Sequence, residues 1–130
     1  MEPFSAILTV FITFIGILIF FYFVPIGTWF TAKLSGVRIT LLELIFMRLR
    51  KSPVTEIVNG LVISAKAGVV IERNQLEAHG LAGGDITNVV TGMILAKNAG
   101  LNLSFQQAAA LDFKGIKISE LVKKELNIKE

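Results

Sequence analysis

The feature that most constrains this chain is a run of thirty positions without a charged residue, between Glu2 and Lys33. A helix needs roughly 20 apolar residues to cross a bilayer core of about 30 Å. Backbone groups in lipid must be hydrogen-bonded within their own segment, so the run is predicted to be helical despite its β-branched residues. Pro25 should end this helix because proline lacks a backbone donor. We predict a membrane anchor in residues 1–34, which crosses at about residues 4–24 and is interfacial at 25–34.

Two other interpretations of the apolar run are possible besides a single retained crossing. A cleaved signal peptide predicts a basic start, an apolar core of about 7–15 residues and a small-x-small cleavage site. The chain starts with Met-Glu-Pro, its apolar core is longer, and no Ala-x-Ala follows, so a retained anchor is favoured. Residues 28–34 could instead re-enter the membrane as the second arm of a hairpin. That arm is short, so a single crossing is favoured, with Trp29 as an interfacial aromatic anchor.

Basic residues gather immediately after the apolar run. Between Lys33 and Lys51 there are five basic residues and one acidic residue, whereas Ser52–Glu130 carries eight of each sign. The positive-inside rule therefore predicts that the C-terminal part of this membrane protein is cytoplasmic. A basic belt of this kind favours anionic head groups of the lipid bilayer, not nucleic acid, as its partner. The predicted membrane-interface residues are Trp29, Lys33, Arg38, Arg48, Arg50 and Lys51.

A basic juxtamembrane helix is predicted within residues 35–53. Thr40 is a plausible N-cap, and Pro53 should stop the helix. Apolar side chains cover most of the surface between them, apart from a face that includes Glu43 and Met47. A helix with this much apolar surface must either be buried in protein or lie in the membrane interface. The sequence leaves both possibilities open.

The remainder of the chain contains an internal repeat. When residues 54–90 are aligned with residues 86–122, an offset of 32, ten of 37 positions are identical. Thr55, Thr87 and Ser119 are predicted to cap helices, and a glycine just past a helix end supplies the left-handed turn at low cost. The predicted fold is therefore mainly α, with two and a partial 32-residue helix pair in residues 54–126. The glycines expected at the turns are Gly68, Gly83, Gly100 and Gly115.

Few residues offer chemistry. His79 is the only histidine and there is no cysteine, so a structural role is favoured over a metal site. The stretch from Gly80 to Asp85 is rich in glycine, but it lacks the Lys-Ser/Thr of a phosphate-binding loop. Asp85 and Asp112 are predicted to be cap or turn residues. We therefore expect no catalytic site, no cofactor and no metal, and the chain is not expected to be an enzyme.

Several short stretches resemble one known family. They are Arg48–Lys51, Ala65–Gly68, Asn74–His79 and Leu81–Gly84, preceded by Val24-Pro25, Trp29 and Ser35–Val37. Together, and in this order, they resemble the N-terminal part of the bacterial flotillin-like FloA family. The resemblance implies a scaffold that forms homo-oligomers, organises membrane microdomains and is associated with NfeD-type membrane proteins. It also implies a band-7 domain after this region and a helical C-terminal region.

The resemblance ends at residues 127–130, which would be a truncated junction to an absent band-7 domain. An Asn-Pro-Lys expected there has Ile128 at its centre. A truncated gene, a fragment and a short paralogue all remain open. Our first functional hypothesis is a flotillin-like scaffold that self-associates. The alternative is a small regulatory membrane subunit that binds one larger membrane protein through its helical repeat.

Overall fold

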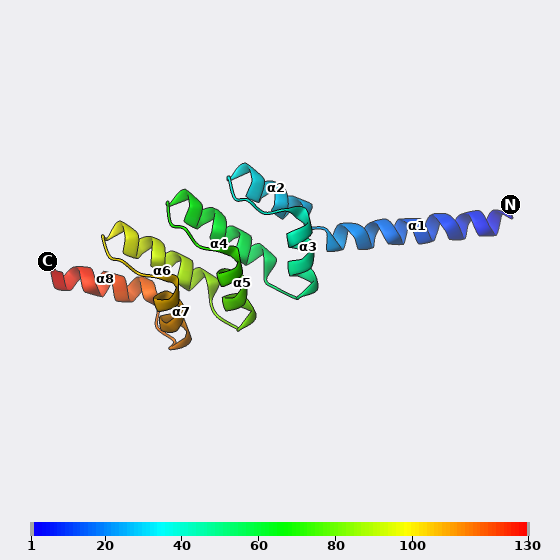
Figure 1. Cartoon of the computed structure of the whole chain (residues 1–130). Coiled ribbons are helices and arrows are strands. Elements are labelled where there is room, and N and C mark those ends of the chain that lie inside the picture. The colour runs from blue at the N-terminus through cyan, green and yellow to red at the C-terminus, as the bar shows by residue number, and fades with distance from the viewer. Residues whose placement is uncertain (1, 130) are drawn as a thin grey trace.

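The computed structural model describes residues 2–129, and its regular elements there are all helices (Figure 1). One long helix extends away from a stack of seven shorter ones, and the two termini lie at opposite ends. The mainly α prediction is therefore confirmed. The helices are α1 (Pro3–Phe23), α2 (Ile26–Leu34), α3 (Leu41–Leu49), α4 (Val54–Lys66), α5 (Arg73–Leu81), α6 (Ile86–Asn98), α7 (Phe105–Phe113) and α8 (Ile118–Lys129).

Helix α1 has no protein core around it. It contains 21 residues, none of them buried, and its surface is almost continuously apolar. The helix ends where the N–H of Val24 donates to the carbonyl of Phe20, one residue before Pro25. Within the described part of the chain, one segment, Pro3–Leu34, is long and apolar enough to cross a membrane by length and composition.

The stack has two layers of helices. Helices α2, α4, α6 and α8 follow one another along one layer, while α3, α5 and α7 cross beside them (Figure 1). Each helix turns one apolar stripe towards a shared core, as expected for elements that cannot bury that stripe alone. The fully buried side chains include Leu44, Met47, Ile57, Leu76, Ile86 and Ile118.

The structural repeat reaches further towards the N-terminus than the sequence alignment did. Helices α3, α5 and α7 begin at residues 41, 73 and 105, thirty-two residues apart. Gly36, Gly68 and Gly100, which precede them at the same spacing, have φ values of 77°, 73° and 73°. The predicted juxtamembrane helix is therefore the second helix of an additional, first unit formed by α2 and α3. The sequence alignment had placed the first unit at Val54.

The turn that closes each unit has the same backbone form but not the same residue. Gly83 and Gly115 have φ values of 85° and 76°, and the corresponding residue of the first unit is Lys51, with φ 60°. This region of φ favours glycine, because a side chain there crowds the following carbonyl at a cost of about 1–2 kcal/mol. Lys51, and not Pro53, marks the end of α3.

The helix caps differ in part from the prediction. Thr40 caps α3 through a capping box with Glu43, as expected. Thr55 and Thr87, however, lie inside their helices, because α4 begins after Pro53 and α6 after Asp85. Asp85 caps α6 by accepting from the Asn88 N–H. A threonine and an aspartate two positions earlier are both good caps by type, so residue type alone could not decide between them.

Candidate membrane interface and links between the repeat units

The junction between α1 and the stack is held by the first repeat unit. Val24 and Pro25 are buried. Arg48 Nη1 donates to the carbonyl of Tyr22, and its guanidinium lies 5.4 Å from the centre of the Tyr22 ring. Because an arginine over an aromatic ring adds a cation–π attraction to the hydrogen bond, α3 holds the end of α1 in place.

The residues predicted to contact the membrane surface all belong to this first unit and its closing turn. Trp29 is half-buried, and Lys33 Nζ lies 4.8 Å from the centre of its ring. Arg38 and Lys51 are exposed. Arg48 supports α1 instead of extending into solvent. Arg50, the last of these residues, forms an ion pair with a carboxylate of the second unit.

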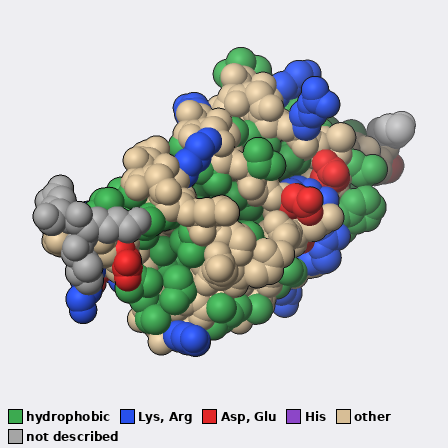
Figure 2. Space-filling model, turned by 60° about the vertical axis from the view of Figure 1, so that its left-hand side comes forward, with side chains coloured by type: hydrophobic (Ala, Val, Ile, Leu, Met, Phe, Trp, Pro, Cys, Tyr) green, Lys and Arg blue, Asp and Glu red, His purple; other side chains and the backbone are tan. Residues whose placement is uncertain are grey.

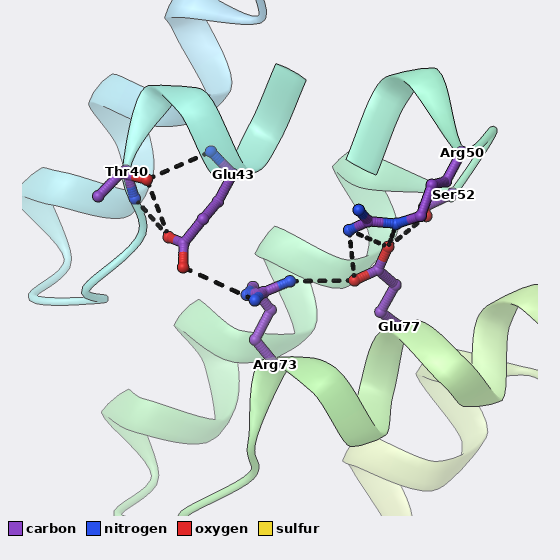
Figure 3. Close-up of polar contacts among 6 residues, drawn as sticks. All are labelled: Thr40, Glu43, Arg50, Ser52, Arg73 and Glu77. Carbon is purple, nitrogen blue, oxygen red and sulfur yellow. Dashed lines mark hydrogen bonds and ion pairs between the residues drawn. The ribbon is translucent and has the colours of Figure 1, made fainter. Parts of the chain in front are cut away.

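That carboxylate belongs to Glu77 on α5, and it joins the first unit to the second (Figure 3). Its side chain is only 7% exposed and accepts from Arg50 Nε at 2.9 Å, Ser52 Oγ at 2.7 Å and Arg73 Nη1 at 3.0 Å. Arg73 also lies 3.6 Å from Glu43 of α3. A buried carboxylate is tolerated when its oxygens accept charge-assisted hydrogen bonds, and here both oxygens do.

Glu43 has a separate role at the start of α3. It accepts from the Thr40 N–H at 2.8 Å and from the Thr40 hydroxyl at 3.1 Å. These bonds, the backbone N–H first, lower the pKa of Glu43 below its usual value, although its partial burial acts the other way. The ionised carboxylate suits the positive end of the helix dipole. Glu43, the only acidic residue between Lys33 and Lys51, therefore already binds the Thr40 cap and Arg73.

A second polar link joins the second unit to the third. His79 on α5 is buried, and its Nε2 lies 2.6 Å from Asp112 Oδ2 on α7. An ionised carboxylate can only accept, so the ring donates. Asp112 also accepts from the Asp85 N–H and from the Asn88 amide, both at 2.8 Å. Asn88 then accepts from the Ile118 N–H at the start of α8. The structural role expected for His79 and the cap role of Asp85 agree with this arrangement.

Burial alone would raise the pKa of Asp112, but the hydrogen bonds from Asn88, Asp85 and His79 outweigh it and hold the pKa below its usual value of 3.8. A carboxyl whose pKa is lower in the folded state stabilises the fold above its unfolded-state pKa. That contribution is lost as the pH falls through the lower, folded-state value.

Replacing Asp112 with Asn should therefore reduce stability near neutral pH by about 2 kcal/mol, since three donors, among them the buried His79 ring, lose a charged acceptor. The variant should also lose part of the stability change that the parent shows between pH 5 and pH 2. Thermal unfolding of the full chain in detergent, followed by circular dichroism over that range, measures both effects. Glu125→Gln, at an exposed carboxylate, is the matched control. Equal pH profiles for parent and Asp112→Asn would contradict the assignment.

The predicted turn glycines lie where helices reverse. Gly68 and Gly100 follow α4 and α6, while Gly83 and Gly115 follow α5 and α7. Gly84, which follows Gly83, is constrained by packing, because a Cβ there would lie 2.2 Å from His79 Nε2. The glycine-rich stretch thus provides a chain reversal and room for the imidazole.

The described residues contain no group of three or more metal-ligating side chains. In the same part of the chain, every buried side-chain nitrogen or oxygen has a hydrogen-bond partner. Glu77, Asp112 and His79 are all engaged in links between units, which suits a structural role.

Sequence reasoning missed the partners of these links. Arg50 and Ser52 lie 27 and 25 residues from Glu77, and His79 lies 33 residues from Asp112. Residues about one repeat length apart in the sequence come into contact only when the units stack. The first unit itself left a signal, because Gly36-Val37-Arg38-Ile39 matches Gly68-Val69-Val70-Ile71 at three of four positions.

An apolar groove lies beside α8. Figure 2, turned so that the C-terminal end comes forward, shows hydrophobic side chains reaching the surface there. The predicted junction at residues 127–130 is helical up to Lys129, and Glu130 lies outside the described residues. The groove is lined by residues that include Leu101, Leu103, Leu111, Leu121 and Val122.

Comparison with known proteins gives one consistent result. The family model for the flotillin-like protein FloA matches residues 6–129. A flotillin-like protein FloA of Alkaliphilus metalliredigens is 40% identical over 118 residues, covering 91% of this chain and 36% of the relative. That of Oceanobacillus iheyensis is 48% identical over 115 residues, covering 88% and 35%. That of Bacteroides fragilis is 42% identical over 126 residues, covering 94% and 38%.

The chain spans little more than a third of the length of these relatives. No solved structure matches it. The family model covers the apolar helix, the first unit and the rest of the stack together. The chain therefore belongs to the flotillin-like protein FloA family, as its motifs had indicated.

Proposed function

We propose that this chain is the membrane-anchoring and self-associating part of a flotillin-like scaffold that organises membrane microdomains. The observation that carries the proposal is α1, an apolar helix without buried residues, fixed to a helix stack through Arg48 and Tyr22. An anchor joined to its domain by a packed junction can transmit the arrangement of the stacks to the surrounding lipid. The expectation that the chain is not an enzyme agrees with membership of a flotillin-like family.

The orientation follows from the charges around the junction. We infer a single crossing that ends near Val24, since α2 packs on α4 and its Ala32 is fully buried. Lys33, Arg38 and Lys51 are exposed after the crossing, which favours a cytoplasmic stack and contact with anionic head groups. Residues 25–53 then form both the first repeat unit and the basic belt.

Self-association would use the apolar groove beside α8. The groove beside α8 leaves apolar side chains such as Leu121 partly exposed, and a partner helix seated in the groove would cover them. A second copy or an NfeD-type membrane protein would each provide one. A homo-oligomer is the first expectation, because the family resemblance implies it.

Imaging of the fluorescently tagged full chain in bacterial cells, combined with cross-linking in isolated membranes, tests the proposal. A scaffold should give patches in the membrane and a ladder of self-linked oligomers. Leu121→Lys, which places a charge in the groove, should reduce both, while Lys123→Glu on the exposed face of α8 serves as the control. Even fluorescence together with a strictly monomeric protein would contradict the proposal.

The same groove suits a second candidate function, that of a small regulatory subunit bound to one larger membrane protein. The two functions differ in stoichiometry. A subunit should cross-link to a single partner at a fixed ratio, whereas a scaffold should cross-link to copies of itself.

A further inference from the structure

The N-terminal end of the stack carries an apolar face, called the end face below. In the later units, the faces at the same repeat positions are interfaces between units. In α4, Val58 and Val62 are 0% and 7% exposed, and this helix packs on α2 and α3 of the preceding unit. Thirty-two residues earlier, Ile26 and Phe30 of α2 occupy the same repeat positions and are 41% and 56% exposed. In the described chain, no helix pair precedes α2 to cover them.

The second helix of the first unit shows the same difference. Arg73 and Glu77 of α5 reach back to the preceding unit through the contacts shown in Figure 3. The corresponding residues of α3 are Leu41 and Ile45, which are partly exposed. The positions that carry the polar link in the second unit are therefore occupied by apolar residues in the first unit. A terminal unit of a soluble repeat array needs a polar outer face instead.

Three observations identify what covers this end face. Helix α1 leaves the stack at the end formed by α2 and α3, opposite α8 (Figure 1), so the face adjoins the helix that is apolar enough to cross a bilayer. The junction is packed, since Val24 is buried and Arg48 binds the carbonyl of Tyr22. Around it lie the exposed cations Lys33, Arg38 and Lys51, while the single acid, Glu43, is occupied by Thr40 and Arg73.

We propose that the membrane surface itself caps the repeat array, so that Ile26, Phe30, Leu41 and Ile45 dip into the interfacial region of the leaflet from which α1 emerges. The stack then stands end-on on the membrane. Since packed helices lie about 8–10 Å apart, each further unit is displaced from the lipid by roughly that distance. This inference rests on the proposed anchoring role of α1 and adds to it a lipid contact made by the stack.

The chain has no cysteine, so single cysteines can report depth at chosen positions. Phe30→Cys reports the end face. Ile63→Cys on α4 is its matched control, because Phe30 and Ile63 are 56% and 53% exposed in the protein. Ile15→Cys, in the middle of α1, reports the anchor. Each full-length variant would carry an environment-sensitive fluorophore and be reconstituted into vesicles of phosphatidylcholine and phosphatidylglycerol, with circular dichroism to verify the helical content.

The proposal predicts that nitroxides at the lipid head group quench the label at residue 30 several-fold more than the label at residue 63. Iodide in the water phase should show the reverse order, and nitroxides deep in the acyl chains should quench the label at residue 15. If residue 15 is quenched from within the bilayer but residue 30 behaves like residue 63, the end-on contact is wrong and the anchor stands. If residue 15 is not quenched from within the bilayer, the anchoring role fails, and the end-on contact with it.

A label at residue 30 that neither head-group nitroxides nor iodide reach would mean that a protein, such as a second copy, covers the face, which overturns the proposal. Ile26→Cys gives an independent reading at the neighbouring position of the same face. Agreement between the labels at residues 26 and 30 is expected if the lipid is the cap.

Discussion

Replacing Gly92 with Ala should loosen α8 from the stack. A Cβ at this position would lie 2.3 Å from Ile118 Cγ2 and 2.5 Å from Ile118 Cβ. Ile118 is completely buried at the start of α8, and an atom next to the backbone cannot move away without moving the helix. Overpacking of this kind costs about 1–3 kcal/mol, and we expect the upper part of that range despite the better helix propensity of alanine.

Gly60, the counterpart of Gly92 in α4, is the control. A Cβ there would meet the tips of Leu76, Val90 and Ile86 at 3.2–3.3 Å, so small adjustments suffice. Gly60→Ala should change stability little, because alanine also gains up to about 1 kcal/mol of helix propensity. Thermal unfolding of the full chain in detergent, with hydrogen exchange of α8 amides, measures both variants. Equal stability of the two, or normal exchange protection of α8 in Gly92→Ala, would contradict the close contact.

Replacing Glu77 with Gln should weaken the link between the first and second units. The substitution keeps the shape of the side chain but removes the charge that Arg50, Ser52 and Arg73 share. Removing one partner of a buried pair can cost about 3–5 kcal/mol. The Arg50 side chain is 49% exposed and can turn to water, so about 2 kcal/mol is expected.

Arg73→Gln should cost less than Glu77→Gln, because Glu77 retains Arg50 and Ser52 as donors. In the double variant the two losses should not add, since both remove the same contact. Chemical unfolding of the three variants in detergent measures the coupling. Strictly additive losses would mean that Arg73 and Glu77 do not interact in solution.

Much of this arrangement could be predicted from the sequence because it depends on local patterns. An uncharged run from Pro3 to Ala32 specifies a helix long and apolar enough to cross a bilayer, and Pro25 specifies its end. Recurrent glycines at residues 68, 83, 100 and 115 specify where helices reverse, because few other residues adopt a positive φ easily. The mainly α fold follows from these local properties.

Only the tertiary structure decided how α3 is used. Its residues LLELIFMRL share little with RNQLEAHGL of α5, and an apolar helix by itself suits either protein or membrane. Stacking buries Leu44 and Met47 while Leu42 and Phe46 stay exposed, so both environments are available to one helix. Likewise, the charge pattern counted Arg50 among the lipid-facing cations, whereas the fold brings Glu77 against it. Contacts between residues about one repeat apart arise from the stacking of units, and a local sequence pattern does not predict which residues then meet.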